Sequence, residues 1–230
     1  MDVSILTLFP QIFQPLLKSS ILNKAQKQGK LRVNLVDLRK FGIGGYRQVD
    51  DRVYGGGVGM ILRVEPIAKA IAKLKIKKQK SKIILLDPQG KKFNQKTALR
   101  LAKEKYLVLI CGKYEGVDER VRKIVDEEIS IGDYVLSGGE IPAMAVVDAI
   151  TRILPGVLEK EATQNESFSS AAIGRKKAIL LEPPQYTRPE EFEGMKVPKI
   201  LLSGNHQEIA KWRAQEALKK TKKLRPDLLN

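Results

Sequence analysis

Two near-continuous apolar runs constrain the fold of this chain more than any other feature of its sequence. They span residues 82–86 and 106–111 and are rich in Ile, Leu and Val. Runs of this kind are typical of strands that are covered on both faces of a parallel sheet. A helical pattern over residues 95–103 separates them, which is the order of a strand–helix–strand crossover unit. The chain is therefore predicted to be an α/β protein built on a parallel sheet.

Two further strands are predicted near the N-terminus, and a second domain is predicted toward the C-terminus. The strands cover residues 3–9 and 31–38, and a helix-like segment beginning at Pro10 lies between them. Residues 159–170 are polar and carry no hydrophobic period, which is typical of an interdomain linker. A helix is predicted to begin near Asn205, because Asn followed by Glu three residues later resembles a capping box.

The charge of the chain limits its partners. Lys and Arg number 42 against 26 Asp and Glu, which gives a net charge of +16. An excess of this size attracts a polyanion, either nucleic acid or an anionic membrane surface. No run approaches the roughly eighteen apolar residues of a membrane span, and the first residues lack the basic segment of a signal peptide, so a cytoplasmic protein is predicted.

The single cysteine, Cys111, excludes a disulfide framework and any multi-cysteine metal site.

Three glycine-bearing loops follow strand-like segments, at residues 87–90, 111–116 and 131–140. Ligands of open α/β sheets bind outside the carboxyl ends of the strands, so these loops are candidates to frame one crevice. None carries the glycine fingerprint of a dinucleotide-binding fold or of a P-loop, which disfavours a pyrophosphate cradle. A ligand held by backbone amides and carbonyls, such as an adenosine without phosphates, remains open. So does the alternative that the loops are ordinary turns.

Arg152 and Glu166 are the candidates for acid–base chemistry. Arg152 lies late in the helical stretch 141–153, and Glu166 lies in the linker. A carboxylate near an arginine can remove a proton while the arginine stabilises the charge that develops. The alternative is that both are solvated surface residues. Cys111 fits a small buried side chain better than a nucleophile, and His206 fits a structural or RNA-contact role better than a general base.

Six segments of the chain resemble bacterial tRNA (guanine-N1)-methyltransferases of the TrmD type, which form part of the SPOUT class. The first of these segments, residues 50–60, lies in a long glycine-rich loop, residues 39–60. The length of that loop by itself indicates a functional role. The match runs in order from the N-terminus to about Leu229. The segments are 50–60, 111–120, 130–142, 155–158, 186–189 and 201–206.

The resemblance implies an α/β fold whose parallel sheet carries a deep trefoil knot, a rare exception to the rule that folds are unknotted. It implies a knotted S-adenosylmethionine-binding domain at 1–158, a flexible linker at 159–170 and a small, mainly helical tRNA-binding domain at 171–230. It also implies a homodimer whose active site combines the knot of one subunit with the C-terminal domain of the other. S-adenosylmethionine carries no phosphate, which agrees with the missing phosphate fingerprints.

Site residues are carried over from the resemblance position by position. Glu166 and Arg152 fall on the catalytic positions. The cofactor positions are Leu86, Pro88, Gly112, Tyr114, Glu115, Gly116, Ile131, Gly132, Asp133, Tyr134, Val135, Leu136, Gly138, Gly139 and Pro142. The substrate positions are Asp50, Arg52, Gly57, Gly59, Arg188, Ser203, Asn205 and His206. No residue is assigned as a metal ligand, although family members suggest Mg²⁺ as an additional requirement.

The implied reaction is methyl transfer to N1 of the tRNA guanosine just 3′ of the anticodon, when another G precedes it. A carboxylate removes the N1 proton, N1 attacks the sulfonium methyl group in line, and an arginine stabilises the charge that moves toward O6. The target base must leave its stack to reach the methyl group. The chain departs from the family in the linker, because Glu166-Ser167-Phe168 stands where Asp-Ser-Phe is usual. The added methylene offsets a linker that is one residue shorter.

Two other functions stay open at this stage. A non-catalytic RNA-binding protein with a degenerate SPOUT fold would also be basic, although the retained cofactor-loop residues argue against it. An enzyme acting on ribosomal RNA or on a ribose 2′-hydroxyl is disfavoured. The 50–60 loop and the motifs around Arg188 and His206 resemble only the tRNA branch.

Overall fold

The computed structural model describes residues 1–74, 81–159, 162–163, 166–173 and 176–229. The chain divides into two compact units, Met1–Leu158 and Glu159–Asn230. The predicted linker, 159–170, falls in the second unit, and its residues 160–161 and 164–165 lie outside the described part of the chain.

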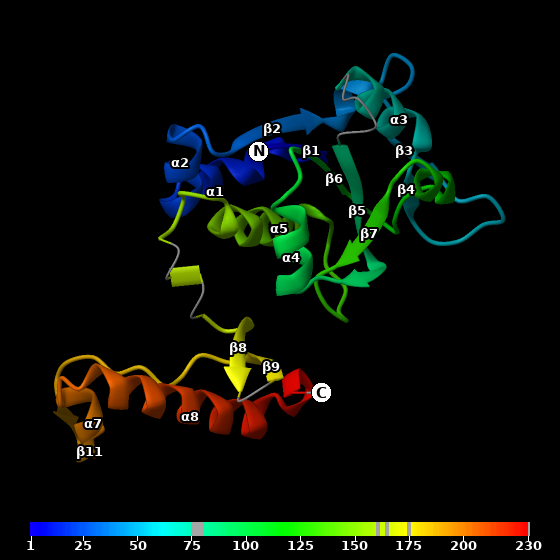
Figure 1. Cartoon of the computed structure of the whole chain (residues 1–230). Coiled ribbons are helices and arrows are strands. Elements are labelled where there is room, and N and C mark those ends of the chain that lie inside the picture. Colours follow the sequence, from blue (N-terminus) through cyan, green and yellow to red (C-terminus); the bar gives the residue numbers. More distant parts are fainter. Residues whose placement is uncertain (75–80, 160–161, 164–165, 174–175, 230) are drawn as a thin grey trace. The chain divides into compact units, whose positions relative to one another are not determined.

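The N-terminal unit is built on a five-stranded parallel sheet with the order β2-β1-β6-β5-β7 (Figure 1). The two apolar runs of the sequence form β6 and the first half of β5, which are neighbours at the centre of the sheet. The predicted α/β fold with a parallel sheet is confirmed. The strands are β1 (Asp2–Thr7), β2 (Arg32–Asp37), β5 (Ser81–Lys92), β6 (Tyr106–Cys111) and β7 (Glu127–Ser130).

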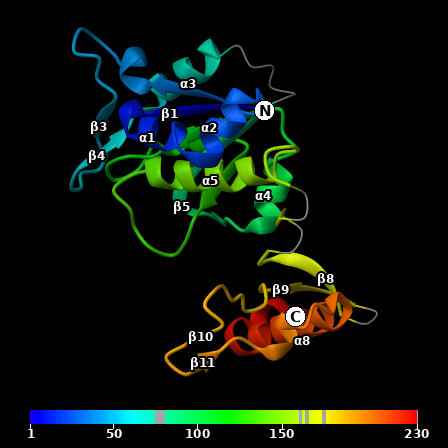
Figure 2. The ribbon, with the colours of Figure 1, turned by 90° about the vertical axis from the view of Figure 1, so that its left-hand side faces the viewer.

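Helices cover both faces of this sheet, as Figures 1 and 2 show, so alternate side chains of β6 enter two separate cores. Leu107 and Leu109 belong to the core under α2 (Ser20–Lys27), α4 (Gln95–Leu101) and α5 (Glu140–Ile153). Val108 and Ile110 belong to the core under α3 (Val64–Lys73) and the 3-10 helices η2 (Leu38–Phe41) and η4 (Glu119–Lys123). Burial on both faces explains why this strand is continuously apolar and does not alternate.

The structure corrects several predicted boundaries. The first strand ends at Thr7, where the sequence predicted residue 9, and a 3-10 helix, η1 (Pro10–Phe13), follows it. The predicted helix after Pro10 is divided into η1, α1 (Gln14–Leu17) and α2, because Ser20 has a positive φ that interrupts the helical path. The predicted loop at 87–90 lies inside β5, whose pairing with β7 shifts register and then resumes at Lys91.

The second unit combines one long helix with short antiparallel strands. Its helix α8 (His206–Leu224) is capped by the Asn205 side chain, which accepts a hydrogen bond from the backbone N–H of Glu208 at 3.3 Å, so the predicted start is confirmed. The sequence predicted a mainly helical domain, but the structure also contains two hairpins. The first of them begins inside the predicted linker. The remaining elements are β8 (Ser169–Ile173), β9 (Lys176–Leu180), β10 (Glu191–Phe192), β11 (Met195–Lys196), α7 (Lys199–Leu202) and η5 (Pro226–Leu229).

A buried threonine fixes the chain that leaves β9 against α8. The Thr221 hydroxyl accepts a hydrogen bond from the backbone N–H of Leu181 at 2.9 Å and donates one to the carbonyl of Ala217 at 2.7 Å. Both Thr221 and Ala217 are buried. A polar group buried in this way must have its partners supplied by the protein, so the contact joins the hairpin and the helix into one unit.

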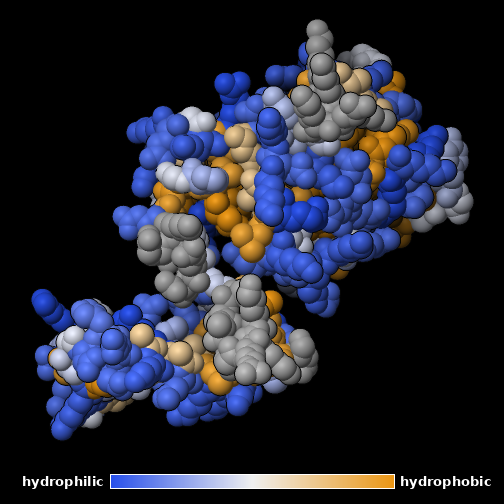
Figure 3. Space-filling model, in the orientation of Figure 1, coloured by the Kyte–Doolittle hydropathy of each residue, from blue (hydrophilic) through white to orange (hydrophobic). Residues whose placement is uncertain are grey.

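Hydrophilic residues cover most of the visible face of the N-terminal unit, with smaller apolar areas between them (Figure 3). No helix among the described residues is both long enough and apolar enough to cross a membrane.

We expect Leu109→Ala to lower the free energy of unfolding of the N-terminal unit by about 2–5 kcal/mol, because it leaves a cavity in the middle of β6. Leu109 is fully buried, whereas Leu99 on α4 is 47% exposed and supplies the matched control. Leu99→Ala should change the free energy by less than about 0.5 kcal/mol. Urea unfolding should be followed by circular dichroism, since the only tryptophan, Trp212, lies in α8 of the other unit. Equal losses for both variants would contradict the assignment of β6 to the core.

Candidate cofactor and substrate site

A pocket of about 220 Å³ lies in the N-terminal unit, where β6 and β7 end and where the register shift interrupts β5 after Leu86. Its wall is formed by the three glycine-bearing loops that the sequence analysis singled out, so they are more than separate turns. This is the edge of an open α/β sheet at which ligands bind. The lining residues are Leu86, Asp87, Pro88, Gln89, Gly112, Lys113, Tyr114, Glu115, Gly116, Ile129, Ser130, Ile131, Gly132, Tyr134, Val135, Leu136, Gly138, Gly139 and Pro142.

The structure brings together all of the predicted cofactor residues except Asp133. That side chain is 83% exposed and pairs with the Lys92 ammonium at 2.7 Å, and it is not part of the pocket lining. The pocket also includes Asp87, Gln89 and Lys113, which the sequence analysis did not select although they lie in the loops it named. Loop membership could be seen in the sequence, but the direction of each side chain could not.

Two of the loops touch each other through their backbones. The N–H of Gly139 donates a hydrogen bond to the carbonyl of Gly112 at 2.8 Å, and Lys113 forms an isolated bridge with Gly138. A Cβ atom on Gly139 would lie 2.6 Å from the Cα atom of Cys111, so no side chain fits between the loops at that point. The glycine is therefore required by the close approach of two backbones.

A buried carboxylate holds the start of α5 to β1. The Glu140 side chain, 5% exposed, accepts a hydrogen bond from the Thr7 hydroxyl at 2.8 Å. That hydroxyl accepts in turn from the backbone N–H of Phe9 at 2.9 Å. Glu140 is the first residue of the helix, where the helix dipole favours a negative charge. The contact fixes the loop that precedes α5 and thereby one wall of the pocket.

The predicted substrate loop is hydrogen-bonded to the pocket. It contains a short hairpin of β3 (Asp50–Arg52) and β4 (Met60–Leu62). The Glu115 N–H donates to the Met60 carbonyl at 3.0 Å, and the Leu62 N–H donates to the Gly116 carbonyl at 3.0 Å.

These hydrogen bonds join the hairpin, which carries the predicted substrate positions of the N-terminal unit, to the loop at 111–116. Asp50 is buried and Arg52 is exposed. A Cβ atom on Gly59 would lie 2.6 Å from the Cγ atom of Glu115, so that glutamate packs directly over the glycine. Gly57 has a φ of +139°, a backbone conformation that favours glycine.

Tyr114 has a constrained backbone and links the loop at 111–116 to the hairpin of β3 and β4. It lies in the cofactor loop with a φ of +60° and forms an isolated bridge with Ile61 of β4. Partial burial and the charge of Asp50 raise the pKa of its phenol above the ordinary value. The phenol is therefore neutral at physiological pH and available as a hydrogen-bond donor.

The predicted substrate positions of the second unit are Arg188, Ser203, Asn205 and His206. Arg188 and His206 line a groove of about 1210 Å³, to which Glu166 and Arg213 also contribute. Ser203 and Asn205 are not among the lining residues and serve the helix end, since the Ser203 hydroxyl accepts from the Asn205 N–H at 3.2 Å. The structure thus separates groove residues from capping residues within one sequence motif.

The two predicted catalytic residues lie in different units. Arg152 is in the last turn of α5, and its side chain is partly exposed. Glu166 is partly exposed as well, and its backbone carbonyl accepts a hydrogen bond from the Ser169 N–H at 3.1 Å. Among the residues that the structure describes, no group of three or more His, Cys, Asp or Glu side chains is placed to hold a metal ion.

The parallel sheet and the glycine-lined pocket at its carboxyl edge define an α/β protein with a candidate ligand site built from closely spaced loops. Comparison with known proteins identifies the family. The family model described as tRNA (Guanine-1)-methyltransferase TrmD matches residues 1–230. The chain belongs to this family, and the resemblance drawn from its motifs is confirmed, as is its place in the SPOUT class.

Several relatives named tRNA (guanine-N(1)-)-methyltransferase match the chain over nearly its whole length. The protein from Dictyoglomus turgidum is 54% identical over 228 residues, which cover 99% of this chain and 89% of the relative. The protein from Geobacillus kaustophilus is 53% identical over 232 residues, covering 100% and 92%. The protein from Mycoplasmopsis synoviae is 51% identical over 229 residues, covering 100% and 97%.

We expect the Cys111 thiol to resist alkylation by iodoacetamide in the native protein at pH 8. Burial, with a smaller contribution from the charge of Glu140, raises the pKa of this thiol well above its usual range, so almost no thiolate is present. Mass spectrometry should detect modification only after denaturation. A cysteine placed at the exposed Leu99 position (Leu99→Cys) provides the reactive control. Rapid labelling of Cys111 in folded protein would contradict its placement in the core.

Proposed function

We propose that this protein transfers a methyl group from S-adenosylmethionine to N1 of the guanosine 3′-adjacent to the anticodon of tRNA. The observation that carries the proposal is the pocket at the carboxyl edge of the sheet, whose lining contains every predicted cofactor residue but Asp133. Membership of the tRNA (guanine-1)-methyltransferase TrmD family supports it. The proposal therefore rests on a specific site as well as on the family.

The pocket residues suit S-adenosylmethionine better than a phosphorylated nucleotide. The apolar side chains of Leu86, Ile131 and Leu136 can contact an adenine ring, and the glycine loops present backbone donors and acceptors to its edges. The single lysine of the lining, Lys113, donates to the Ser137 carbonyl at 2.6 Å and is not directed at a phosphate. The carboxylate of Glu115 favours a cationic ligand, as a sulfonium is.

Bound there, the cofactor supplies a methyl group on a positively charged sulfur. Glu166 acts as the general base that accepts the proton from guanine N1, which is a weak nucleophile until the proton leaves. Arg152 stabilises the negative charge that develops at O6. The extra methylene of Glu166, relative to the aspartate usual in the family, changes the reach of the carboxylate but not its chemistry.

The hairpin at 50–62 and the second unit hold the tRNA in this proposal. Asp50, Arg52, Gly57 and Gly59 lie on a segment joined to the cofactor loop by backbone hydrogen bonds, so they can position the flipped guanosine near the methyl group. The cationic α8 binds phosphates, together with Arg188 and His206 in the groove. A homodimer with a trefoil knot and a composite active site, in the cytoplasm, completes the proposal. A requirement for Mg²⁺ is tested by chelation.

We expect Glu166→Gln to abolish methyl transfer to unmodified tRNA, because the amide cannot accept the N1 proton. Glu166→Asp should retain or raise activity, because it restores the carboxylate of the family motif. Transfer of labelled methyl groups to N1 is the measurement, and the cofactor affinity of each variant should equal that of the wild type. Glu159→Gln, an exposed carboxylate at the start of the same segment, is the control and should be fully active.

The same assay separates the proposed enzyme from a binding protein. If the wild type binds S-adenosylmethionine but transfers nothing while Glu166→Asp does, the natural chain is a weakened or binding-only member of the family. If Glu166→Gln transfers at the wild-type rate, Glu166 is not the base.

We expect the affinity for tRNA to fall steeply with salt, because phosphate contacts release counterions. A protein with about six phosphate contacts loses on the order of 10³-fold between roughly 50 and 200 mM salt. Replacing the exposed Lys222 and Lys223 of α8 by Gln should reduce the slope, measured by filter binding. The matched control replaces Lys24 and Lys27, exposed on α2. An equal reduction in both variants would contradict α8 as the principal tRNA contact.

A further inference from the structure

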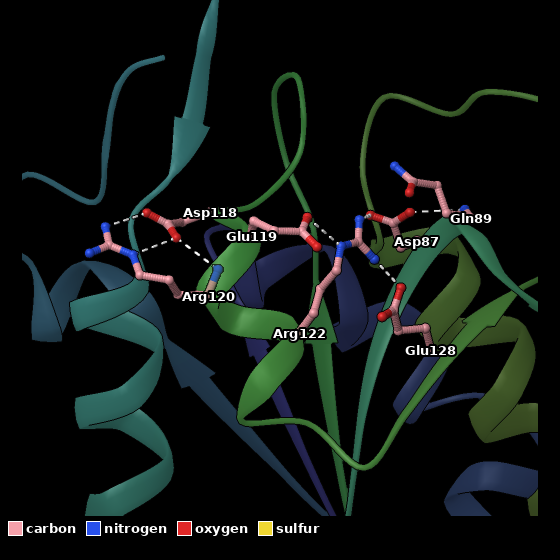
Figure 4. Close-up of polar contacts among 7 residues, drawn as sticks. All are labelled: Asp87, Gln89, Asp118, Glu119, Arg120, Arg122 and Glu128. Carbon is pink, nitrogen blue, oxygen red and sulfur yellow. Dashed lines mark hydrogen bonds and ion pairs between the residues drawn. The ribbon is translucent and has the colours of Figure 1, made fainter. Parts of the chain in front are cut away.

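Arg122, which does not line the pocket, pairs with three carboxylates beside the pocket segment at 87–90 (Figure 4). The guanidinium of Arg122, from η4, lies 3.3 Å from an oxygen of Asp87 and 2.9 Å from an oxygen of Glu119. It also forms an ion pair with Glu128 of β7. The Arg122 side chain is 16% exposed and that of Asp87 is 8% exposed, so this pair is largely removed from water.

Asp87 is the first residue of a bulge that forms one wall of the pocket. β5 pairs with β7 up to Leu86 opposite Ile129, and pairing resumes at Lys91, again opposite Ile129. The residues between are looped out of the ladder, and Asp87, Pro88 and Gln89 line the pocket. The second oxygen of Asp87 accepts the backbone N–H of Gln89 at 2.9 Å, so the same carboxylate shapes the turn of the bulge.

The base of the bulge is close-packed against β7. A Cβ atom on Gly90 would lie 2.4 Å from the backbone nitrogen of Ile129 and 2.5 Å from the carbonyl carbon of Glu128. Glu128 therefore lies beside the point at which the bulge returns to the sheet. Its carboxylate and that of Asp87 share one guanidinium, which links the beginning of the bulge to the strand at its end.

We propose that Arg122 is a positioning residue of the cofactor pocket, clamping the bulge at 87–90 by bridging Asp87 to Glu128. A guanidinium presents several donors in a fixed plane and can bind two carboxylates at once, which the single ammonium of a lysine does less well. Without it, Asp87 would be a buried carboxylate next to like charges, and the bulge would move outward to reach water. The inference rests on the proposed function, because it assumes that this pocket binds S-adenosylmethionine.

The clamp is specific to one arginine of η4. Arg120, two residues away, pairs instead with Asp118 at 2.6 Å, and Figure 4 shows it directed away from Asp87 and Glu128. A second arginine on the other side of β7 offers a matched control. Arg100 of α4 donates two hydrogen bonds to Glu127, at 2.6 and 2.8 Å, and neither residue lines the pocket.

The test is calorimetric binding of S-adenosylmethionine to the full chain carrying Arg122→Gln, Arg122→Lys or Arg100→Gln. We expect Arg122→Gln to raise the Kd about tenfold or more, the effect of removing a charged hydrogen-bond partner. Arg122→Lys should raise it less, and Arg100→Gln should leave it unchanged. In methyl transfer, Arg122→Gln should raise the KM for S-adenosylmethionine while kcat and the affinity for tRNA stay near the wild-type values. The double variant Arg122→Gln, Glu128→Gln should recover part of the lost affinity, because it removes one of the opposing charges.

Several results would overturn the inference. One is an unchanged Kd in folded Arg122→Gln, and another is an equal loss in Arg100→Gln. If Arg122→Gln does not fold, Arg122→Lys decides, and a wild-type Kd in that variant would reject the bridging role. A wild-type chain that binds no S-adenosylmethionine would overturn the proposed function itself, which distinguishes the two failures.

Discussion

The burial of β6 on both faces is the constraint on which the rest of the N-terminal unit depends. Leu109 faces one helical layer and Val108 the other, so the body of the sheet offers no surface for a ligand. Chemistry can take place only where the strands end. At the carboxyl end of β6, Cys111 is followed by Gly112, whose carbonyl accepts the N–H of Gly139 from the loop after β7. The pocket forms where β6 and β7 end beside the bulge of β5.

Much of this arrangement could be predicted from local sequence, because each signal concerns residues that are close together in the chain. The apolar runs identify β5 and β6, and the cap at Asn205 identifies the start of α8. Glycine after a strand marks each loop of the pocket. Asp133 shows the limit of prediction from local sequence. Only the structure reveals that its side chain forms an ion pair with Lys92, which is distant in the sequence.

The features that escaped prediction depend on pairing across the chain. The bulge at 87–90 is defined by the register of β5 against β7, and no property of the four residues alone shows that the strand resumes. The Arg122–Asp87 pair joins residues that are 35 positions apart. In the second unit, the hairpins are short, and β10 and β11 have only two residues each, which is too few for a periodic pattern. The first hairpin is held to α8 by a contact between distant residues, the hydrogen bond from the Leu181 N–H to the Thr221 hydroxyl.

The residues assigned to the proposed reaction are distributed over both units of the chain. Every residue that lines the cofactor pocket belongs to the N-terminal unit, and so does every member of the Arg122 cluster. Glu166 belongs to the second unit, which also carries the basic helix. In the proposed reaction, cofactor affinity therefore reports on one unit, whereas methyl transfer depends on both. In the proposed reaction, a substitution that weakens cofactor binding is expected to raise KM for the cofactor, whereas one that removes the base is expected to lower kcat. Glu166, where the family usually has aspartate, lies outside the lining of the cofactor pocket, so in the proposed reaction we expect that change to act on kcat and not on cofactor affinity.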